Sequence, residues 1–294
     1  MPDPQSPTPN PFIFDRRRLK QHRDRAAARF AQNDFMFHEG ATRLVERLAD
    51  IRRVFPRVLD LGAHDGYLRE HLTGVSGIEW IVQTDISERL LRSPPPAGGR
   101  VRAAPPEATW RRGEGVKLVC DEEFLPFADH SFDLVMSLFS LHWINDLPGT
   151  LIQINRLLKP GGLLIAMLPG GETLKELRQS FEQAELAASG GLTPRISPFV
   201  DTRDGAMLLQ RAGFTLPVAD SEMLSIHYDD PMKLIEDLRH TGETNTLMTA
   251  AKGGMRRAVL YGAMEYYQAH FAEPSGKIRA TCEIVTLTGW KKDA

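Results

Sequence analysis

The chain has 294 residues, of which 42% are hydrophobic and 25% charged, a composition typical of a globular protein with a sizeable core. Its formal net charge of -2 at pH 7 excludes a general attraction to polyanions, so nucleic acid is not expected as a partner. Only two cysteines occur, and no CxxC, which argues against a disulfide scaffold and a cysteine-based zinc site.

The start of the chain lacks the pattern of a secretion signal. Residues 1–11 are rich in proline and small polar residues, which predicts a disordered tail. No apolar run approaches the roughly 18 residues that a membrane-spanning helix needs. Both cysteines, Cys120 and Cys282, lie in apolar runs, where a thiol usually packs as a small hydrophobe. We therefore expect a soluble protein of a reducing compartment, located in the cytoplasm.

A basic segment follows the tail. Between Asp15 and Arg29 the sequence DRRRLKQHRDRAAAR has the alanine and arginine content of a helix. Two interpretations are open. The segment is either a helix with a solvated charged face or a basic arm that docks on an acidic protein partner.

Helical and strand patterns alternate in the next part of the chain. The apolar residues between Leu44 and Ile51 have the spacing of an amphipathic helix. After Pro56, short apolar runs alternate with helical patterns; the runs are RVLDL, EWIVQTD, VKLVC, FDLVMSLF and GLLIAML. Strands that alternate with helices predict an α/β fold with a parallel sheet covered by helices on both faces.

The second half of the chain departs from this alternation. A helical pattern, ETLKELRQSFEQAELAA, is followed by the glycine- and proline-marked loop GGLTPRISPF. An insertion at this point is expected to cap a substrate pocket. The last apolar run, ATCEIVTLTGW, alternates polar and apolar residues, which favours an edge strand with one wet face.

The stretch VLDLGAHDGYL predicts a binding turn. A strand ending at Asp60 runs into a turn with Gly62 and Gly66 and then into a helix. In open α/β sheets, ligands bind beyond the carboxyl ends of the strands, where the chain reverses its strand order. Glycine serves such a turn by adopting positive φ or by letting a ligand approach the backbone.

Acidic residues follow the next two strands as well. The second strand ends in Asp85, where a carboxylate can accept hydrogen bonds from both hydroxyls of a ribose. The third is followed by Asp121 and Glu122, where an acid can receive an adenine amino group. Three consecutive strands ending in acids indicate a nucleoside site.

The turn favours S-adenosylmethionine over a nicotinamide dinucleotide. A dinucleotide site has the pattern GxGxxG, so that a helix N-terminus faces the pyrophosphate. Here Asp65 stands at the start of the helix, and its carboxylate would repel a pyrophosphate. A nucleoside that carries a cationic sulfur fits this site better.

These motifs resemble those of the class I S-adenosylmethionine-dependent methyltransferases. The resemblance runs through VLDLGAHDGYL, QTDIS, CDEEFLPF, FDLVMSLFSLHW and LLKPGGLL. Further segments, among them SLHWINDLPG, GGETLKELR and EDLRHTGETN, resemble the methyltransferase-like assembly factors of respiratory complex I, which act as protein arginine hydroxylases on an iron-sulfur subunit. A more distant resemblance is to the malonyl-carrier-protein methyltransferases of biotin synthesis.

The resemblance implies a Rossmann-like seven-stranded sheet with an antiparallel last strand, helices on both faces, N-terminal helices and a cap insertion. ATCEIVTL would supply the antiparallel strand. The corresponding division of the chain is a tail at 1–11, N-terminal helices at 12–55, a cofactor-binding core at 56–168, a cap at 169–212, and C-terminal strands and helices at 213–294.

Taken position by position, the resemblance also assigns cofactor contacts. They are Asp60, Gly62, Ala63, His64 and Gly66 in the turn, Asp85 at the ribose, Ile86 against the adenine ring, Asp121 and Glu122 at the adenine, and Ser137 on the fourth strand. His64 stands where the family pattern has a middle glycine. Because histidine tolerates positive φ, we expect the turn to form with the His64 ring at the rim of the cofactor.

Three further residues are candidates for catalysis. His142, after the fourth strand, is either a base or a histidine hydrogen-bonded to the backbone. Glu172 and Glu243 are candidate partners of a substrate guanidinium, or else ordinary helix-start and surface carboxylates. No metal site is predicted, because the H-x-D spacing of His227 and Asp229 arises easily by chance in a strand-like run.

Three functions remain open at this stage. The first is an S-adenosylmethionine-binding enzyme that modifies an arginine of a complex I iron-sulfur subunit, by hydroxylation if the resemblance holds. The second is an O-methyltransferase for a small carboxylate or a malonyl carrier protein, which would need a cation such as Arg195 or Arg203. The third is an assembly chaperone without catalysis, which would dock through residues 15–29.

Overall fold

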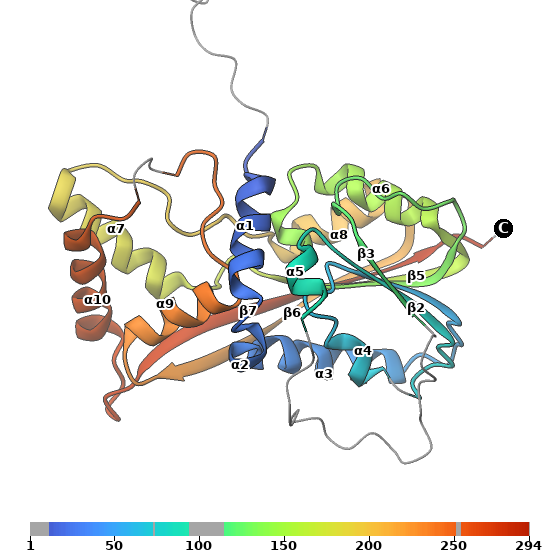
Figure 1. Ribbon diagram of the computed structural model, residues 1–294, viewed down its shortest axis with the longest axis horizontal. Helices are drawn as coiled ribbons and strands as arrows, with labels where there is room; N and C mark the ends of the chain where they lie inside the picture. The colour runs from blue at the N-terminus through green and yellow to red at the C-terminus, as the bar shows by residue number, and fades with distance from the viewer. Residues whose placement is uncertain (1–11, 73, 94–114, 251–253, 294) are drawn as a thin grey trace, which may run out of the picture.

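The computed structural model describes residues 12–72, 74–93, 115–250 and 254–293 (Figure 1). The predicted tail at residues 1–11 lies outside this part. Among the described residues, no helix combines the length and apolar character that crossing a lipid bilayer requires.

A seven-stranded sheet forms the centre of the structure, in the order β3-β2-β1-β4-β5-β7-β6. Its strands are β1 (Arg57–Leu61), β2 (Trp80–Asp85), β3 (Gly115–Val119), β4 (Phe132–Leu138), β5 (Leu158–Pro169), β6 (Phe214–Tyr228) and β7 (Ile278–Lys291). The first five strands are parallel, and β7 runs antiparallel to both β5 and β6. The predicted fold class is confirmed.

Helices cover both faces of the sheet. On one face, α3 (Phe35–Ala49) and α4 (Leu68–His71) pack against apolar residues of β1, β4 and β5. On the other, α6 (Leu147–Leu157) and α8 (Thr202–Arg211) cover β4, β5 and β7. The predicted amphipathic helix is α3, whose Leu44 and Leu48 are fully buried. A short helix, α5 (Glu88–Leu91), follows β2.

A third layer of helices lies over the far ends of β6 and β7. It consists of α7 (Lys175–Ser189), α9 (Pro231–His240) and α10 (Arg257–Phe271), which share one apolar cluster with the start of β7 (Figure 1). The helical pattern predicted before GGLTPRISPF corresponds to α7. Figure 1 shows this layer on the left, over the ends of β6 and β7, with α1 (Arg16–Ala26) beside it and the short α2 (Phe30–Asn33) below α1.

The prediction that ATCEIVTLTGW forms an edge strand was wrong. This run lies in β7, between β5 and β6, and β6 is the edge strand. The polar residues of β7 meet protein groups instead of water. Thr281 Oγ1 donates to Glu176 on α7, and Glu283 accepts from the backbone N–H of Glu172 across 3.0 Å. The alternation of polar and apolar residues in β7 therefore reflects a strand face whose polar groups are hydrogen-bonded inside the protein.

Candidate functional site

The acids that follow β2 and β3 converge at the carboxyl edge of the sheet, where they bind arginines of α1. Arg23 is fully buried, and its Nη1 lies 2.8 Å from Asp85 Oδ2 and 3.3 Å from Glu122 Oε1. Arg16 binds Asp121 across 2.6 Å and also contacts Glu122. Burial alone would raise the pKa of Glu122, but the two guanidinium groups outweigh it and hold this pKa below its ordinary value.

These contacts occupy the carboxylates that were expected to bind an adenosine. Asp85 Oδ1 accepts from the backbone N–H of Ser87 (2.7 Å), and Oδ2 accepts from Arg23 and from the N–H of His64 (3.1 Å). Glu122 Oε1 accepts from Arg23 and from Ser140 Oγ. With α1 in this position, Asp85 and Glu122 have no exposed acceptor for a ribose or an adenine. The strand ends therefore do not fit S-adenosylmethionine in this conformation.

The turn after β1 is formed as predicted, but protein atoms fill it. Gly62, His64 and Gly66 have φ values of +73°, +56° and +93°, so histidine does adopt the left-handed backbone. A Cβ atom on Gly62 would lie 2.0 Å from Ser140 Oγ, which means that the glycine is needed for close approach of this serine.

The ring of His64 is not at an open rim. It is fully buried, with the ring of Phe30 stacked at 5.5 Å and the ring of Phe37 edge-on at 4.7 Å between centroids. Neither ring nitrogen of His64 has a hydrogen-bond partner, although Nε2 lies 3.9 Å from Glu243 Oε1.

Other residues assigned to the cofactor are buried in or beside the sheet. Asp60 accepts from Gln83 Nε2 across 3.0 Å, and burial raises the pKa of Asp60 to about 6. Ser137 Oγ donates to the carbonyl of Leu61, and the N–H of Ala63 donates to the carbonyl of Thr84. Ile86 is 9% exposed.

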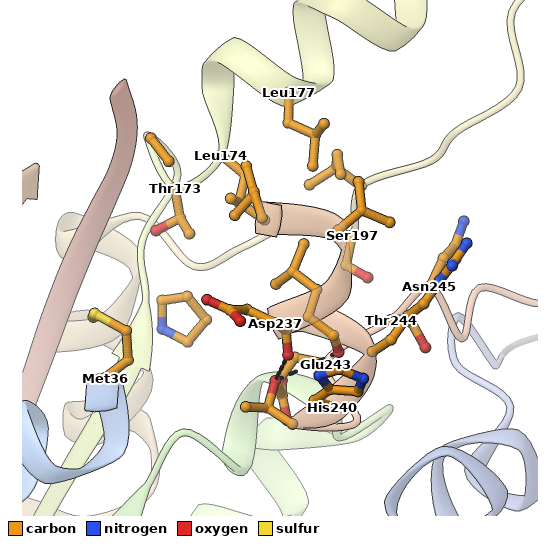
Figure 2. Close-up of a pocket in the computed structure, with 18 of the residues that line it drawn as sticks. Met36, Thr173, Leu174, Leu177, Ser197, Asp237, His240, Glu243, Thr244 and Asn245 are labelled. Carbon is orange, nitrogen blue, oxygen red and sulfur yellow. Dashed lines mark hydrogen bonds between the residues drawn. The ribbon is translucent and has the colours of Figure 1, made fainter. Parts of the chain in front are cut away.

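A cavity of about 960 Å³ lies next to the strand-end acids, beyond α1. It is lined by residues of α1, α3, α7 and α9, of the segment after β4, of the ends of β5 and β6, of the start of β7, and of the loop after α7. Figure 2 shows Asp237, His240 and Glu243 on one side of the cavity, with Thr173, Leu174 and Leu177 across from them. The lining includes the aromatic residues Phe35, Phe37, Phe139, Trp143, Phe181, Phe199 and Tyr228.

Glu243 is an acid of this cavity that is held by two side-chain contacts. Its Oε2 accepts from Trp143 Nε1 across 2.9 Å and lies 3.0 Å from His142 Nε2. Burial would raise the pKa of Glu243, but the hydrogen bond to His142, the nearby ring of His64 and the charge of Arg23 together hold this pKa well below the ordinary range. Glu243 is therefore ionised at pH 7.

His142 is neutral beside this carboxylate. Burial lowers the pKa of His142 below 6.5, against the opposing effect of Glu243. Because an ionised carboxylate only accepts hydrogen bonds, the proton of the neutral ring is on Nε2. This leaves Nδ1 as an unprotonated nitrogen with no partner among the described residues. His142 and Glu243 thus form a buried base and carboxylate pair.

Comparison with known proteins decides the family. The methyltransferase-domain family profile matches residues 28–217. The chain belongs to the methyltransferase-domain family. It is 38% identical over 282 residues to the mitochondrial arginine-hydroxylase NDUFAF5 of Rattus norvegicus, covering 95% of this chain and 77% of the rat protein. The predicted family is confirmed, and the chain is an enzyme of the S-adenosylmethionine-dependent methyltransferase family.

Two further comparisons extend this result. The malonyl-[acyl-carrier protein] O-methyltransferase of Gallionella capsiferriformans is 30% identical over 282 residues, covering 96% of this chain and 93% of that protein. The crystal structure of the YcgJ protein from Bacillus subtilis matches with a TM-score of 0.56 at 13% identity, over 87% of this chain and 100% of that one. At that identity the structural match shows the methyltransferase fold alone.

Of the three predicted catalytic residues, this methyltransferase-family chain brings two together. His142 and Glu243 meet in the cavity, whereas Glu172 does not line it. The carboxylate of Glu172 is half exposed and pairs with Lys175 across 3.0 Å. It therefore has the position of an ordinary surface carboxylate at the start of α7.

Neither Arg195 nor Arg203, the cations named for a carboxylate substrate, is an unpaired cation of the cavity. Arg195 lines the cavity, but it donates to Glu185 through Nε and Nη2. Arg203 is an exposed residue of α8 that does not line the cavity. Sequence reasoning missed other cations of the lining, which are Arg18, Arg25 and Arg29 of the basic segment and Arg239 of α9.

The buried role of Arg23 was also missed, and helical spacing contained the signal for it. Arg16, Leu19, Arg23 and Ala26 recur at intervals of three and four residues, which places them on one face of α1. Leu19 and Ala26 mark this face as buried, and the arginines are buried with them. Arg16 and Arg23 therefore belong neither to a solvated helix face nor to a free docking arm, the two interpretations given for the basic segment, because they pair with acids at the strand ends.

No metal centre was found in the part of the chain that the structure describes, where no group of three His, Cys, Asp or Glu side chains is arranged to hold an ion. His227 pairs with Glu273 across 3.1 Å, and Asp229 pairs with Lys233 and Lys277. Cys120 and Cys282 are free, and burial raises the pKa of each thiol to about 12.

Proposed function

We propose that this enzyme modifies the side chain of an arginine on a protein substrate, and that the substrate is an iron-sulfur subunit of respiratory complex I during assembly. The relatives named arginine-hydroxylase, which match 95% of this chain at up to 38% identity, support this assignment. The observation that carries it is the ionised carboxylate of Glu243 in a cavity lined with aromatic residues.

A guanidinium is the ligand that these groups suit best. It pairs with carboxylates through charge-assisted hydrogen bonds, and its flat face stacks on aromatic rings. Glu243 supplies the charge, while Trp143 and Phe199 supply aromatic surface beside it. Asp237, whose pKa is raised by burial, gives the cavity a second carboxyl group.

His142 is proposed as the base that accepts the proton released when the arginine is modified. Its Nδ1 is unprotonated at pH 7 and can take up a proton that the substrate releases. Glu243 holds the ring through Nε2 and stabilises the imidazolium that forms. For hydroxylation, the added oxygen comes from an external oxidant such as O2 together with a two-electron reductant.

S-adenosylmethionine is the proposed cofactor, because the match to the methyltransferase-domain family favours it. Arg23 occupies the strand-end acids here, so no step is derived through the cofactor. We also propose residues 169–212 as the cap, since Arg195, Ile196, Ser197 and Phe199 line the cavity.

A second candidate function is O-methylation of a malonyl group on a carrier protein. Four arginines of the cavity lining favour it, namely Arg18, Arg25, Arg29 and Arg239, because they suit an anionic substrate. It is weaker than the first candidate, since the O-methyltransferase of Gallionella capsiferriformans matches at 30% identity and the arginine-hydroxylases at up to 38%.

Mass spectrometry separates the two candidates. The complex I iron-sulfur subunit would be isolated from cells that carry the wild-type enzyme, the variant Glu243→Gln or no enzyme. We expect an arginine of the subunit to gain one oxygen with the wild-type enzyme and to stay unmodified in the other two cases. A gain of one methylene would indicate methylation instead. Formation of malonyl methyl ester on a carrier protein, with an unmodified subunit, would contradict the first candidate.

A further inference from the structure

The helix α1 separates the strand-end acids from the large cavity. One face carries Arg16 and Arg23, which bind Asp85, Asp121 and Glu122. Residues Arg18, His22, Arg25 and Arg29 of the same segment line the cavity, at intervals of three and four residues. A movement of α1 would therefore open both sites together.

Arg23 takes the place of a ligand at the strand ends. Its guanidinium supplies hydrogen-bond donors to Asp85, Glu122 and Ser140 Oγ, and its charge neutralises two carboxylates that are fully buried. Removing it would leave the buried Asp85 without its cation and would leave Glu122 paired with Arg16 but not with Arg23, which is costly unless another group with donors replaces it. Ribose hydroxyls and an adenine amino group are such donors, and a sulfonium adds a positive charge.

The remaining contacts of α1 are suited to release. Asp24 accepts from Ser87 Oγ (2.6 Å), His22 Nδ1 lies 2.7 Å from Thr244 Oγ1, and Arg18 donates to a backbone carbonyl. Water can replace polar contacts of this kind. Leu19 belongs to a small separate cluster with Phe14, Trp143 and Leu247 and not to either large core of the sheet. The buried Nε of Arg23 has no hydrogen-bond partner among the described residues, which disfavours the docked state.

We propose that α1 is a displaceable plug: Arg23 occupies the adenosyl site in cis, so that docking of α1 and binding of S-adenosylmethionine exclude each other. This inference rests on the proposed function, because it takes S-adenosylmethionine as the ligand. The apparent Kd for the ligand is then the intrinsic Kd divided by the fraction of molecules in which α1 is undocked.

The first test is isothermal titration of the full-length chain with S-adenosylmethionine. The variant Arg23→Ala frees Asp85 and removes one of the two arginine contacts of Glu122, and we expect it to bind at least tenfold more tightly than the wild type. Arg17→Ala is the matched control, since Arg17 is an exposed residue of the same helix, and its affinity should equal that of the wild type. Equal affinity of Arg23→Ala and wild type, or weaker binding by Arg23→Ala, would overturn the plug.

The second test does not depend on the folding of Arg23→Ala. The side chains of Asp24 and Ser87 are in contact, so the pair Asp24→Cys and Ser87→Cys is designed to link α1 to α5 by a disulfide, whose formation is verified by the loss of two free thiols on oxidation. The oxidised protein should lose binding of S-adenosylmethionine, and reduction of the same sample should restore it. Cys120 and Cys282 are poor competitors for this bond, because burial keeps their thiols protonated. Unchanged binding by the oxidised protein would overturn the plug.

Hydrogen exchange gives a readout that separates the plug from the cofactor assignment. Addition of S-adenosylmethionine to the wild type should increase exchange of the amides of residues 16–26, and stronger protection there would contradict displacement. If neither wild type, Arg23→Ala nor the reduced cysteine pair binds S-adenosylmethionine, the cofactor assignment itself fails, and the plug fails with it. If all three bind with equal affinity and oxidation has no effect, only the plug fails.

Discussion

His142 Nε2 lies 3.0 Å from Oε2 of Glu243, a contact between residues 101 positions apart in the chain. It joins the end of β4 to the segment that follows α9, and so connects the main sheet to the outer helical layer. The two side chains determine each other's ionisation: the carboxylate fixes the tautomer of the imidazole, and the imidazole stabilises the carboxylate. Four testable consequences follow from this pair and from the turn after β1.

The variant Glu243→Gln should impair both substrate binding and stability. It replaces a charged acceptor of Trp143 and His142 by a neutral one, and hydrogen bonds to charged groups contribute about 1.5–3 kcal/mol. We expect KM for the arginine substrate to rise by about 10–100-fold, which is the same free energy expressed as an affinity. Steady-state kinetics test this expectation. Glu172→Gln is the matched control, and an equal effect of both variants would refute a specific role of Glu243.

The variant His142→Asn should change how stability depends on pH. The pKa of His142 is lowered by burial, so at acidic pH the unfolded chain takes up a proton that the folded chain does not. The neutral ring thus causes no loss of stability above pH 6.5, whereas stability is lost as the pH falls from there through the folded pKa. Urea unfolding at pH 8, 6.5 and 5.5 should show the stability advantage of wild type over His142→Asn shrinking toward acid. A difference that is the same at all three pH values would disprove the assignment.

The variant Asp60→Asn should be more stable than wild type at neutral pH. Burial raises the pKa of Asp60 from 3.8 to about 6, which means that the folded state resists ionisation. The stability associated with the protonated group is complete below pH 3.8 and is lost as the pH rises through 6. The loss is about 3 kcal/mol, from 1.36 kcal/mol for each pH unit between the two values. Asparagine avoids it, so chemical denaturation should show a gain above pH 6.5 that disappears near pH 4.

The variant Gly62→Ala should be strongly destabilised for two separable reasons. The backbone has a φ of +73°, which disfavours a side chain by about 1–2 kcal/mol, and the new Cβ would overlap Ser140 Oγ. Such an overlap lowers the free energy of unfolding by about 1–3 kcal/mol. In a double-mutant cycle, Gly62→Ala made in the background of Ser140→Gly should lose the destabilisation caused by the overlap and keep the destabilisation caused by the positive φ. Strictly additive costs would show that Ser140 is not the cause.

Much of the sheet could be predicted from the sequence because its strands are buried on both faces. Short apolar runs such as RVLDL and GLLIAML are typical of strands that are buried on both faces. The acids at the ends of β2 and β3 lie close together because neighbouring parallel strands end at the same edge of the sheet. The interior position of ATCEIVTLTGW in the sheet could not be predicted from its alternation. Alternation reports that one face of a strand is polar, but not whether water or Glu176 meets that face.

The sequence by itself determined which segments form strands, the left-handed turn at His64, and the acids at the strand ends. These depend on local periodicity and on the φ preferences of single residues. Only the tertiary structure decided what the acids bind and which carboxylate meets His142. Both outcomes depend on long-range contacts: Arg23 reaches Asp85 over 62 positions, and Glu243 reaches His142 over 101. Charge signs in a sequence show which groups can pair, while the packing of α1 and α9 against the sheet selects the pairs that form.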